Sequence, residues 1–248
     1  MFDNRHDGRF PTGRGDDYLF HAANVCGHNV VLATLPAGQN YGTGSTAALV
    51  SQSEEVLPKP LVRFARWRCR RLPNLSTNPP RDIRLGDVLV APPEGGSAGL
   101  VGYDLGKETK DGFQLLRFGH ALATTEAIVR SAIGSIKIHA PNDSERFLVH
   151  YTNMKDEEHA HGTFVDPGPD RDVLYEVDEY RMEKLVKRGP WPDSRRTPVW
   201  YGPIGSGDKL MKNAQKRNEL RDKYNVIGLE MEAAGTMNYI PVGVIRGS

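Results

Sequence analysis

Two acidic residues flank a methionine in the stretch Gly-Leu-Glu-Met-Glu-Ala-Ala-Gly, residues 228–235. Burying an ionised carboxylate destabilises a protein unless cations or N–H groups satisfy it. Glu230 and Glu232 therefore either face water at the acidic start of a helix or line a pocket. In a pocket, a carboxylate accepts hydrogen bonds from the hydroxyls of a neutral, sugar-like ligand, and the thioether of Met231 packs on the apolar side of that ligand.

Three Gly-rich segments each follow an expected strand, which is where open α/β folds bind ligands. They are residues 35–45, 202–209 and 229–235. Glycine lets a backbone approach a ligand closely and leaves N–H groups available to anions at the start of the next helix. One such turn is weak evidence, but three turns, one of which carries the paired acids, favour a ligand site.

Length and composition are those of an ordinary folded protein. The chain has 248 residues, of which 38% are hydrophobic and 25% are charged, so one larger domain or two small ones would fit. The net charge of +1 indicates no general attraction to nucleic acid or acidic lipid.

Cysteine content and hydropathy bear on location. Cys26 and Cys69 are the two cysteines, which make neither a disulfide framework nor a metal-binding set and suit a reducing compartment. No apolar run approaches the length of a membrane span, and no signal-peptide core follows Met1. We therefore expect a cytoplasmic protein with no membrane partner.

Apolar periodicity alternates between strand and helix along the chain, which predicts an α/β layered fold. The expected strands are residues 28–34, 87–93, 197–208, 226–232 and 242–247. The expected helices are residues 43–57, 120–140, 209–225 and 232–238, the first of them with Thr43 or Ser45 as a possible cap. Residues 1–17 are polar and Gly-rich without periodicity, so we expect an unstructured leader followed by one domain, residues 18–248.

Two weaker features are set aside. His159 and His161 lie near acidic residues in the segment 153–172, but without cysteine partners a solvated surface patch is the better interpretation, and no metal site is predicted. Ser206 has no neighbouring histidine and lies outside a G-x-S-x-G motif, which argues against a serine hydrolase.

Six motifs together resemble the nucleoside phosphorylase family in its fungal form. They occupy residues 28–48, 81–91, 103–107, 201–213, 228–238 and 244–247. The resemblance runs with gaps from His21 to Gly247, and its specific part is Ser-Gly-Asp followed at this separation by Glu-Met-Glu-Ala-Ala-Gly. In that family the domain is often the front module of a larger protein that carries nucleotide-binding or repeat regions.

The resemblance implies a three-layer α/β sandwich that is incomplete at both termini. It implies that the domain cleaves the N-glycosidic bond of purine or related nucleosides, with phosphate or water as the attacking group and without a cofactor. Many members are homo-oligomers. The site residues that the resemblance implies are Met231 and Glu232 on the ribose, Leu210 and Met211 against the base, and Ser206, Gly207 and Asp208 in the turn that supports the base.

The chain also departs from the family pattern. Residues 1–17 show no phosphate-binding strand and turn, and the family's general-acid Asp would lie four positions after Arg246, beyond Ser248. Losing a positioned acid typically slows a reaction by about 10²–10⁴-fold. Whether the chain is an active enzyme is therefore left open, and the alternative is a catalytically dead nucleoside-binding or signalling module.

A basic stretch replaces the family's glycine loop. Residues 63–71 contain five arginines and Trp67, and so much unpaired charge conflicts with a buried strand. One codon string for Arg66–Arg71 encodes Ala-Gly-Gly-Val-Ala in the neighbouring frame, so we hypothesise a short out-of-frame segment. Nucleic-acid binding by this patch is the less favoured alternative, because the net charge is near zero.

Overall fold

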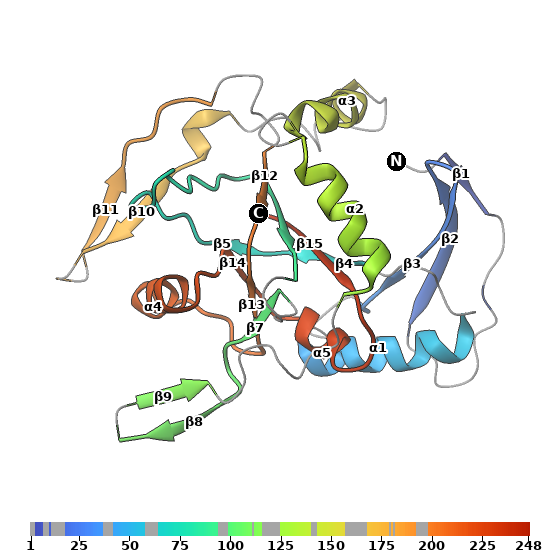
Figure 1. The fold of residues 1–248 in the computed structure, drawn as a ribbon, viewed down its shortest axis with the longest axis horizontal. Helices are drawn as coiled ribbons and strands as arrows, with labels where there is room; N and C mark the ends of the chain where they lie inside the picture. The colour runs from blue at the N-terminus through green and yellow to red at the C-terminus, as the bar shows by residue number, and fades with distance from the viewer. Residues whose placement is uncertain are drawn as a thin grey trace.

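The structure is a computed structural model that describes residues 3–6, 10, 18–36, 42–57, 64–93, 99–110, 112–115, 125–139, 143–156, 168–178, 180, 182–191 and 198–248. Within these residues the helices are α1 (Thr43–Val56), α2 (Ala127–Lys137), α3 (Asp143–Asp156), α4 (Ala214–Tyr224) and α5 (Ala233–Met237), with one 3-10 turn, η2 (Pro169–Arg171). Figure 1 shows α2 and α4 on opposite sides of the central strands.

Two four-stranded sheets form the centre. The first has the order β12 (Val199–Tyr201), β6 (Val88–Ala91), β15 (Gly243–Gly247), β4 (Phe64–Arg68). The second has the order β5 (Arg70–Arg71), β14 (Gly228–Glu230), β13 (Ile204–Ser206), β7 (Leu100–Gly102). Because β4 and β5 follow each other with one residue between them, the two sheets are continuous along the chain at this point.

Three smaller sheets extend from this centre in the described part of the chain, as Figure 1 shows. They are β1 (Asn4–Arg5), β2 (Leu19–Val25) and β3 (His28–Thr34); β8 (Gly106–Thr109) and β9 (Gly112–Leu115); and β10 (Leu174–Val177) and β11 (Glu183–Val186). All their strand pairs are antiparallel.

Alternating side chains along the central strands feed separate apolar clusters. In β6, Leu89 and Ala91 belong to a central core, whereas Val90 between them belongs to a second cluster, as the period of two in a strand requires. The central core draws on both sheets and on α1 and α5; its members are Val50, Ile83, Leu89, Ala91, Leu100, Ile204, Ile227, Ala233, Met237, Ile240, Val242 and Val244. It therefore lies between the two sheets.

Helices cover the outer faces of both sheets. Val129 and Ile133 of α2 pack on Val90 of the first sheet, and Leu220 of α4 packs with Val101 and Leu229 of the second. Strands thus lie between helices, which confirms the α/β fold class expected from the sequence.

Several expected elements have different bounds. The expected strand 197–208 is two strands, β12 and β13, which belong to different sheets; between them Gly202 N–H donates to Val90 and Ile204 N–H donates to Gly99. Helix α4 begins at Ala214 rather than Lys209, because Asn213 is its N-cap and accepts a hydrogen bond from Lys216 N–H at 3.0 Å.

The first residues also differ from expectation where the structure describes them. Asn4–Arg5 of the expected leader forms β1, which pairs with Asn24 and Ala23 of β2. Most of residues 1–17 lies outside the described residues, so the division into leader and domain stays a prediction. His159 and His161 of the acidic segment also lie outside the described residues, so their interpretation as a solvated surface patch stays a prediction. Helix α3 has no counterpart among the expected helices.

No helix in the described ranges combines the length and the apolar character that crossing a membrane requires.

Candidate functional site

Three parallel strands end side by side in the second central sheet. In register, Ser206 of β13 lies opposite Gly102 of β7 and Glu230 of β14. The residues that follow these strands therefore share one sheet edge, where α/β folds place ligand sites. Two of the three Gly-rich segments singled out in the sequence end here.

Glu230 is satisfied within the protein. Its carboxylate accepts hydrogen bonds from the N–H groups of Glu232 at 3.0 Å and Ala233 at 2.9 Å, at the start of α5. It also pairs with the Arg246 guanidinium of β15. Both side chains are fully buried. Glu230, the first acid of the motif, therefore has a structural role. It binds the N–H groups at the start of a helix and forms a buried ion pair.

Glu232 is in a different situation. It is the N-cap residue of α5 but makes no side-chain cap hydrogen bond; its Oε2 accepts from Met231 N–H at 3.1 Å. Burial raises the pKa of Glu232 to about 7, and the neighbouring Glu230 carboxylate adds to the rise. At neutral pH this side chain can either accept or donate a hydrogen bond. A buried carboxylate with a raised pKa at a strand end is typical of a functional site.

The Ser-Gly-Asp turn joins this edge to two helices. Ser206 Oγ accepts a hydrogen bond from Ala234 N–H of α5 at 2.9 Å. The Asp208 carboxylate accepts from Thr43 N–H at 2.7 Å, at the start of α1. The third Gly-rich segment, residues 35–45, thus reaches the same edge at its described end.

Helix α1 is capped differently from the expectation. Gly42 is its N-cap with φ +102° and no side-chain cap, and neither Thr43 nor Ser45 takes that role. Asp208 from the turn after β13 supplies the acceptor instead. A Cβ at Gly42 would lie 2.9 Å from Asp208 Oδ1, so glycine is favoured by both the backbone conformation and the space.

Met231 is half-buried beside Glu232, so the residues expected on the ribose lie together with Ser206, Gly207 and Asp208. The side chains of the two residues expected against the base have different surroundings. Leu210 is 63% exposed, and Met211 packs against the apolar cluster under α4. Their contact with a base stays a prediction.

Sequence reasoning missed three residues at this edge. Arg246 is fully buried on Glu230; an arginine within the apolar run Val-Ile-Arg-Gly needs a buried carboxylate, and that signal could have paired it with an acid of the motif. Asp104 accepts a hydrogen bond from Asp208 N–H at 2.5 Å. The Tyr103 hydroxyl donates to the carbonyl oxygens of Gly207 at 3.1 Å and Lys209 at 2.7 Å. Tyr103 and Asp104 lie in the motif 103–107 of the family resemblance, but that resemblance gave them no role.

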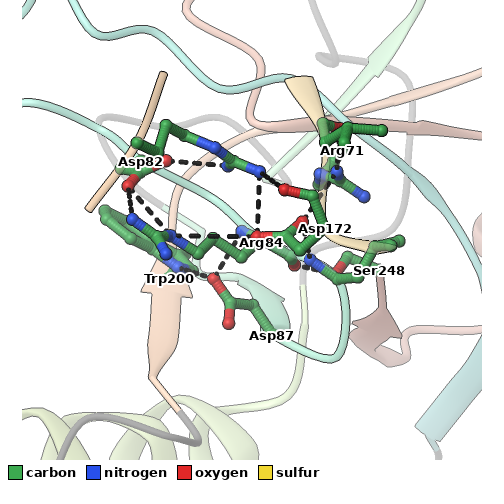
Figure 2. Close-up of polar contacts among 10 residues, drawn as sticks. Arg71, Asp82, Arg84, Asp87, Asp172, Trp200 and Ser248 are labelled. Carbon is green, nitrogen blue, oxygen red and sulfur yellow. Dashed lines mark hydrogen bonds and ion pairs between the residues drawn. The ribbon is translucent and has the colours of Figure 1, made fainter. Parts of the chain in front are cut away.

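A second polar group, which we call the arm cluster, lies at the base of the β10–β11 arm (Figure 2). Asp172 precedes β10 and Arg188 follows β11, and they pair at 2.8 Å. Asp172 also contacts Arg71 at 3.1 Å, and Arg188 contacts Asp82 at 2.9 Å. The remaining members are Arg84, Asp87 and Trp200.

Asp82 and Asp172 of the arm cluster are paired with its arginines, whereas Asp87 is held by neutral N–H donors. Arg84 binds Asp82 at 2.6 Å, and Asp87 accepts from Trp200 Nε1 and from Arg84 N–H, both at 2.7 Å. Burial raises the pKa of Asp87 to about 7. Arg71 of the basic stretch is thus satisfied by Asp172, so its charge does not conflict with the fold. The frame hypothesis for residues 66–71 stays a prediction.

The strand order, the two covering helices and the shared edge of β7, β13 and β14 define an α/β domain, and solved structures that superpose on it show that its fold is of the nucleoside phosphorylase type. Among solved structures, a futalosine hydrolase mutant of Helicobacter pylori superposes with a TM-score of 0.51 and 13% identity, covering 97% of this chain and 77% of that one. A 5′-methylthioadenosine/S-adenosyl homocysteine nucleosidase of Campylobacter jejuni gives 0.50 and 14%, covering 92% and 70%.

One curated sequence relative is a nucleotide-binding leucine-rich repeat (NLR)-like protein of Hyaloscypha variabilis. It is 28% identical over 256 aligned residues, which cover 100% of this chain and 24% of that protein. The chain therefore spans about a quarter of the length of this relative. No known protein-family model matches the chain.

Proposed function

We propose that this domain binds a purine nucleoside at the shared edge of β7, β13 and β14 and cleaves its N-glycosidic bond. One observation carries the proposal: Glu232 lies buried beside Met231 and its carboxylate accepts a hydrogen bond from Met231 N–H, while Glu230 next to it is satisfied by Arg246 and the start of α5. The solved structures of similar fold are named as hydrolases and nucleosidases, which supports the same reaction class.

The residues divide the work as follows. Ionised Glu232 accepts hydrogen bonds from the ribose hydroxyls, and Met231 packs on the sugar. The turn of Ser206, Gly207 and Asp208 lies next to them and supports the base, which Leu210 and Met211 contact. Cleavage breaks the bond between the anomeric carbon and the base nitrogen. The bonding electrons leave with the base, which gains a proton, and water or inorganic phosphate bonds to the sugar carbon.

The test is direct. Purified protein is incubated with adenosine, inosine or 5′-methylthioadenosine, with and without inorganic phosphate, and the released base is measured by chromatography. We expect base release by the wild-type chain and roughly 10²-fold less by Glu232→Gln. Free ribose would identify water as the attacking group, and ribose 1-phosphate would identify phosphate. Failure of the wild-type chain to bind or cleave any of the three would contradict the proposal.

A second function is favoured by the NLR-like relative, of which the chain covers 24%. In this alternative the domain binds the nucleoside without cleaving it and serves as a sensing module of a cytoplasmic signalling protein. Calorimetric binding without base release separates the two. Light scattering with and without nucleoside tests whether the domain forms homo-oligomers.

A further inference from the structure

Helix α1 takes its cap from a residue far along the chain. Thr43 N–H donates to Asp208 Oδ1 at 2.7 Å, and Thr43 Oγ1 contacts both carboxylate oxygens at 2.8 Å. The first N–H groups of a helix have no partner within it, and a carboxylate beside them also interacts favourably with the helix dipole. Asp208, separated from Thr43 by 165 positions, therefore takes the part that a local N-cap side chain usually has.

Asp104, two residues after the end of β7, holds Asp208 in this position. Its Oδ2 accepts a hydrogen bond from Asp208 N–H at 2.5 Å. A Cβ at Gly207 would lie 2.7 Å from Asp104 Oδ1, so the glycine permits this close approach. The Tyr103 hydroxyl fixes the same turn through the carbonyl oxygens of Gly207 and Lys209. The turn is thus held to β7 from two sides.

The start of α1 in turn lies against α5, as Figure 1 shows for the two helices. A Cβ at Gly235 would lie 1.9 Å from the Thr43 carbonyl oxygen, so the two helices approach at backbone distance. Ala234 N–H is bonded to Ser206 Oγ of the adjoining turn. Because α5 starts directly after Glu232, a displacement of Thr43 would displace Glu232 as well.

We propose that Asp208 and Asp104 are positioning residues, which set the first turn of α1 against α5 and thereby hold Glu232 in place. The capping contact is a property of the free protein. Its effect on a ligand rests on the proposed function, so the two parts are measured separately.

The first measurement is hydrogen exchange in the free protein. In Asp208→Ala, amides at the start of α1 should exchange roughly tenfold faster, since losing an N-cap typically destabilises a helix start to that extent. Thr43→Val, which removes the hydroxyl at nearly constant shape, should give part of this effect, and Thr43→Ser should resemble wild type. Exchange in α4 is the internal control. Unchanged exchange at residues 43–46 in Asp208→Ala would overturn the cap.

The second measurement is the affinity for adenosine by calorimetry. Thr43→Val should weaken binding by roughly tenfold and Thr43→Ser by less than about twofold, since only valine loses hydrogen bonds to a charged group. In a double-mutant cycle, Glu232→Gln should weaken binding less in the Asp208→Ala or Thr43→Val background than in wild type. A hydroxyl that only stabilised α1 would leave the two substitutions additive.

The outcomes are distinguishable. Absence of adenosine binding by the wild-type chain would contradict the proposed function, while hydrogen exchange would still decide the cap. Faster exchange at α1 with unchanged affinity, or with additive substitutions, would overturn the positioning role. If Asp208→Ala does not fold, the pair Thr43→Val and Thr43→Ser decides both parts.

Discussion

Buried acids occur in two regions of this domain, and their partners differ. In the arm cluster, Asp82 and Asp172 face the guanidinium groups of Arg71, Arg84 and Arg188. At the strand-end edge, the acids are held mainly by backbone N–H groups and a hydroxyl. We call this second group the edge cluster; its members are Thr43, Asp104, Asp208, Glu230, Glu232 and Arg246.

The difference bears on what each region can do. A carboxylate paired with two guanidinium groups has its lone pairs occupied and its charge neutralised, which suits a structural contact. A carboxylate that accepts from one backbone N–H group retains acceptor capacity and a raised pKa, as Glu232 does, which suits a ligand contact. Asp82 and Asp172 of the arm cluster therefore form a clamp, whereas Glu232 marks a candidate site. Asp87 is the exception in the arm cluster, because its carboxylate accepts from Trp200 Nε1 and Arg84 N–H and its pKa is also raised to about 7.

The largest loss of stability is expected at the buried ion pair of Arg246 and Glu230, which, like the pairs of the arm cluster, joins a guanidinium group to a carboxylate. Arg246→Met should destabilise the protein by about 3–5 kcal/mol, because it leaves the buried Glu230 carboxylate without its cation. Urea unfolding at constant pH measures this. Adding Glu230→Gln should restore a large part of the loss, and equal stability of the single and double variants would contradict the pairing.

Glu232→Gln should stabilise the protein, in contrast to Arg246→Met. The pKa of Glu232 is about 7 in the folded state, which is above its value in the unfolded chain. Ionising Glu232 therefore destabilises the folded protein as the pH rises above the unfolded pKa. The penalty is complete above about pH 7 and absent below the unfolded pKa. Removing the charge should stabilise the protein by about 1–3 kcal/mol at about pH 8 and by less than about 1 kcal/mol at about pH 5. Thermal unfolding at both pH values is the measurement, and an equal effect at both would contradict the raised pKa.

Asp172→Asn tests the clamp. It removes the charge that Arg71 and Arg188 share, while the amide keeps one acceptor, so we expect a loss of about 1–2 kcal/mol. Limited proteolysis should also cut within residues 174–186 sooner than in wild type. Asp170→Asn, an exposed neighbour in η2, is the matched control and should leave both quantities unchanged.

The smallest effect is expected outside both clusters. Lys216 and Glu219 form a pair at 2.9 Å on α4, with side chains 44% and 62% exposed. Lys216→Ala should change the free energy of unfolding by less than about 0.5 kcal/mol, as measured by urea unfolding. If the loss were as large as that of Asp172→Asn, the exposed pair on α4 would stabilise the protein as much as the buried pairs of the arm cluster, which would contradict the prediction.

Local patterns in the sequence predicted much of the fold. Apolar runs predicted the strands β6, β14 and β15, because a strand buried on both faces needs such a run. The run of β3 also predicted a strand, but the expectation that this strand is buried was wrong, because β3 is largely exposed in an antiparallel sheet outside the central core. The split between β12 and β13 was missed, although Gly202 and Pro203 between them are a turn signal. The two strands diverge there through hydrogen bonds to Val90 and Gly99. The start of α4 was predicted too early, because the lysine-containing segment before Asn213 resembles the charged sequence of the helix itself.

Contacts across large sequence separations could not be predicted in the same way. The motif acids Glu230 and Glu232 were recognised as a candidate site, but their different situations depend on Arg246, which lies on another strand. Likewise the cap of α1 comes from Asp208 and not from a residue beside Thr43. Spacing along the chain carries no information on such pairs until the topology is known.

Both ends of the β10–β11 arm are anchored to the body of the domain: Asp172 before β10 binds Arg71, and Arg188 after β11 binds Asp82. In the described residues, no member of the three apolar clusters comes from the arm. The turn at Tyr180 is therefore a suitable place to divide the chain. Two fragments separated there would each keep one ionic anchor and the paired strands, and they should reassemble as a split protein.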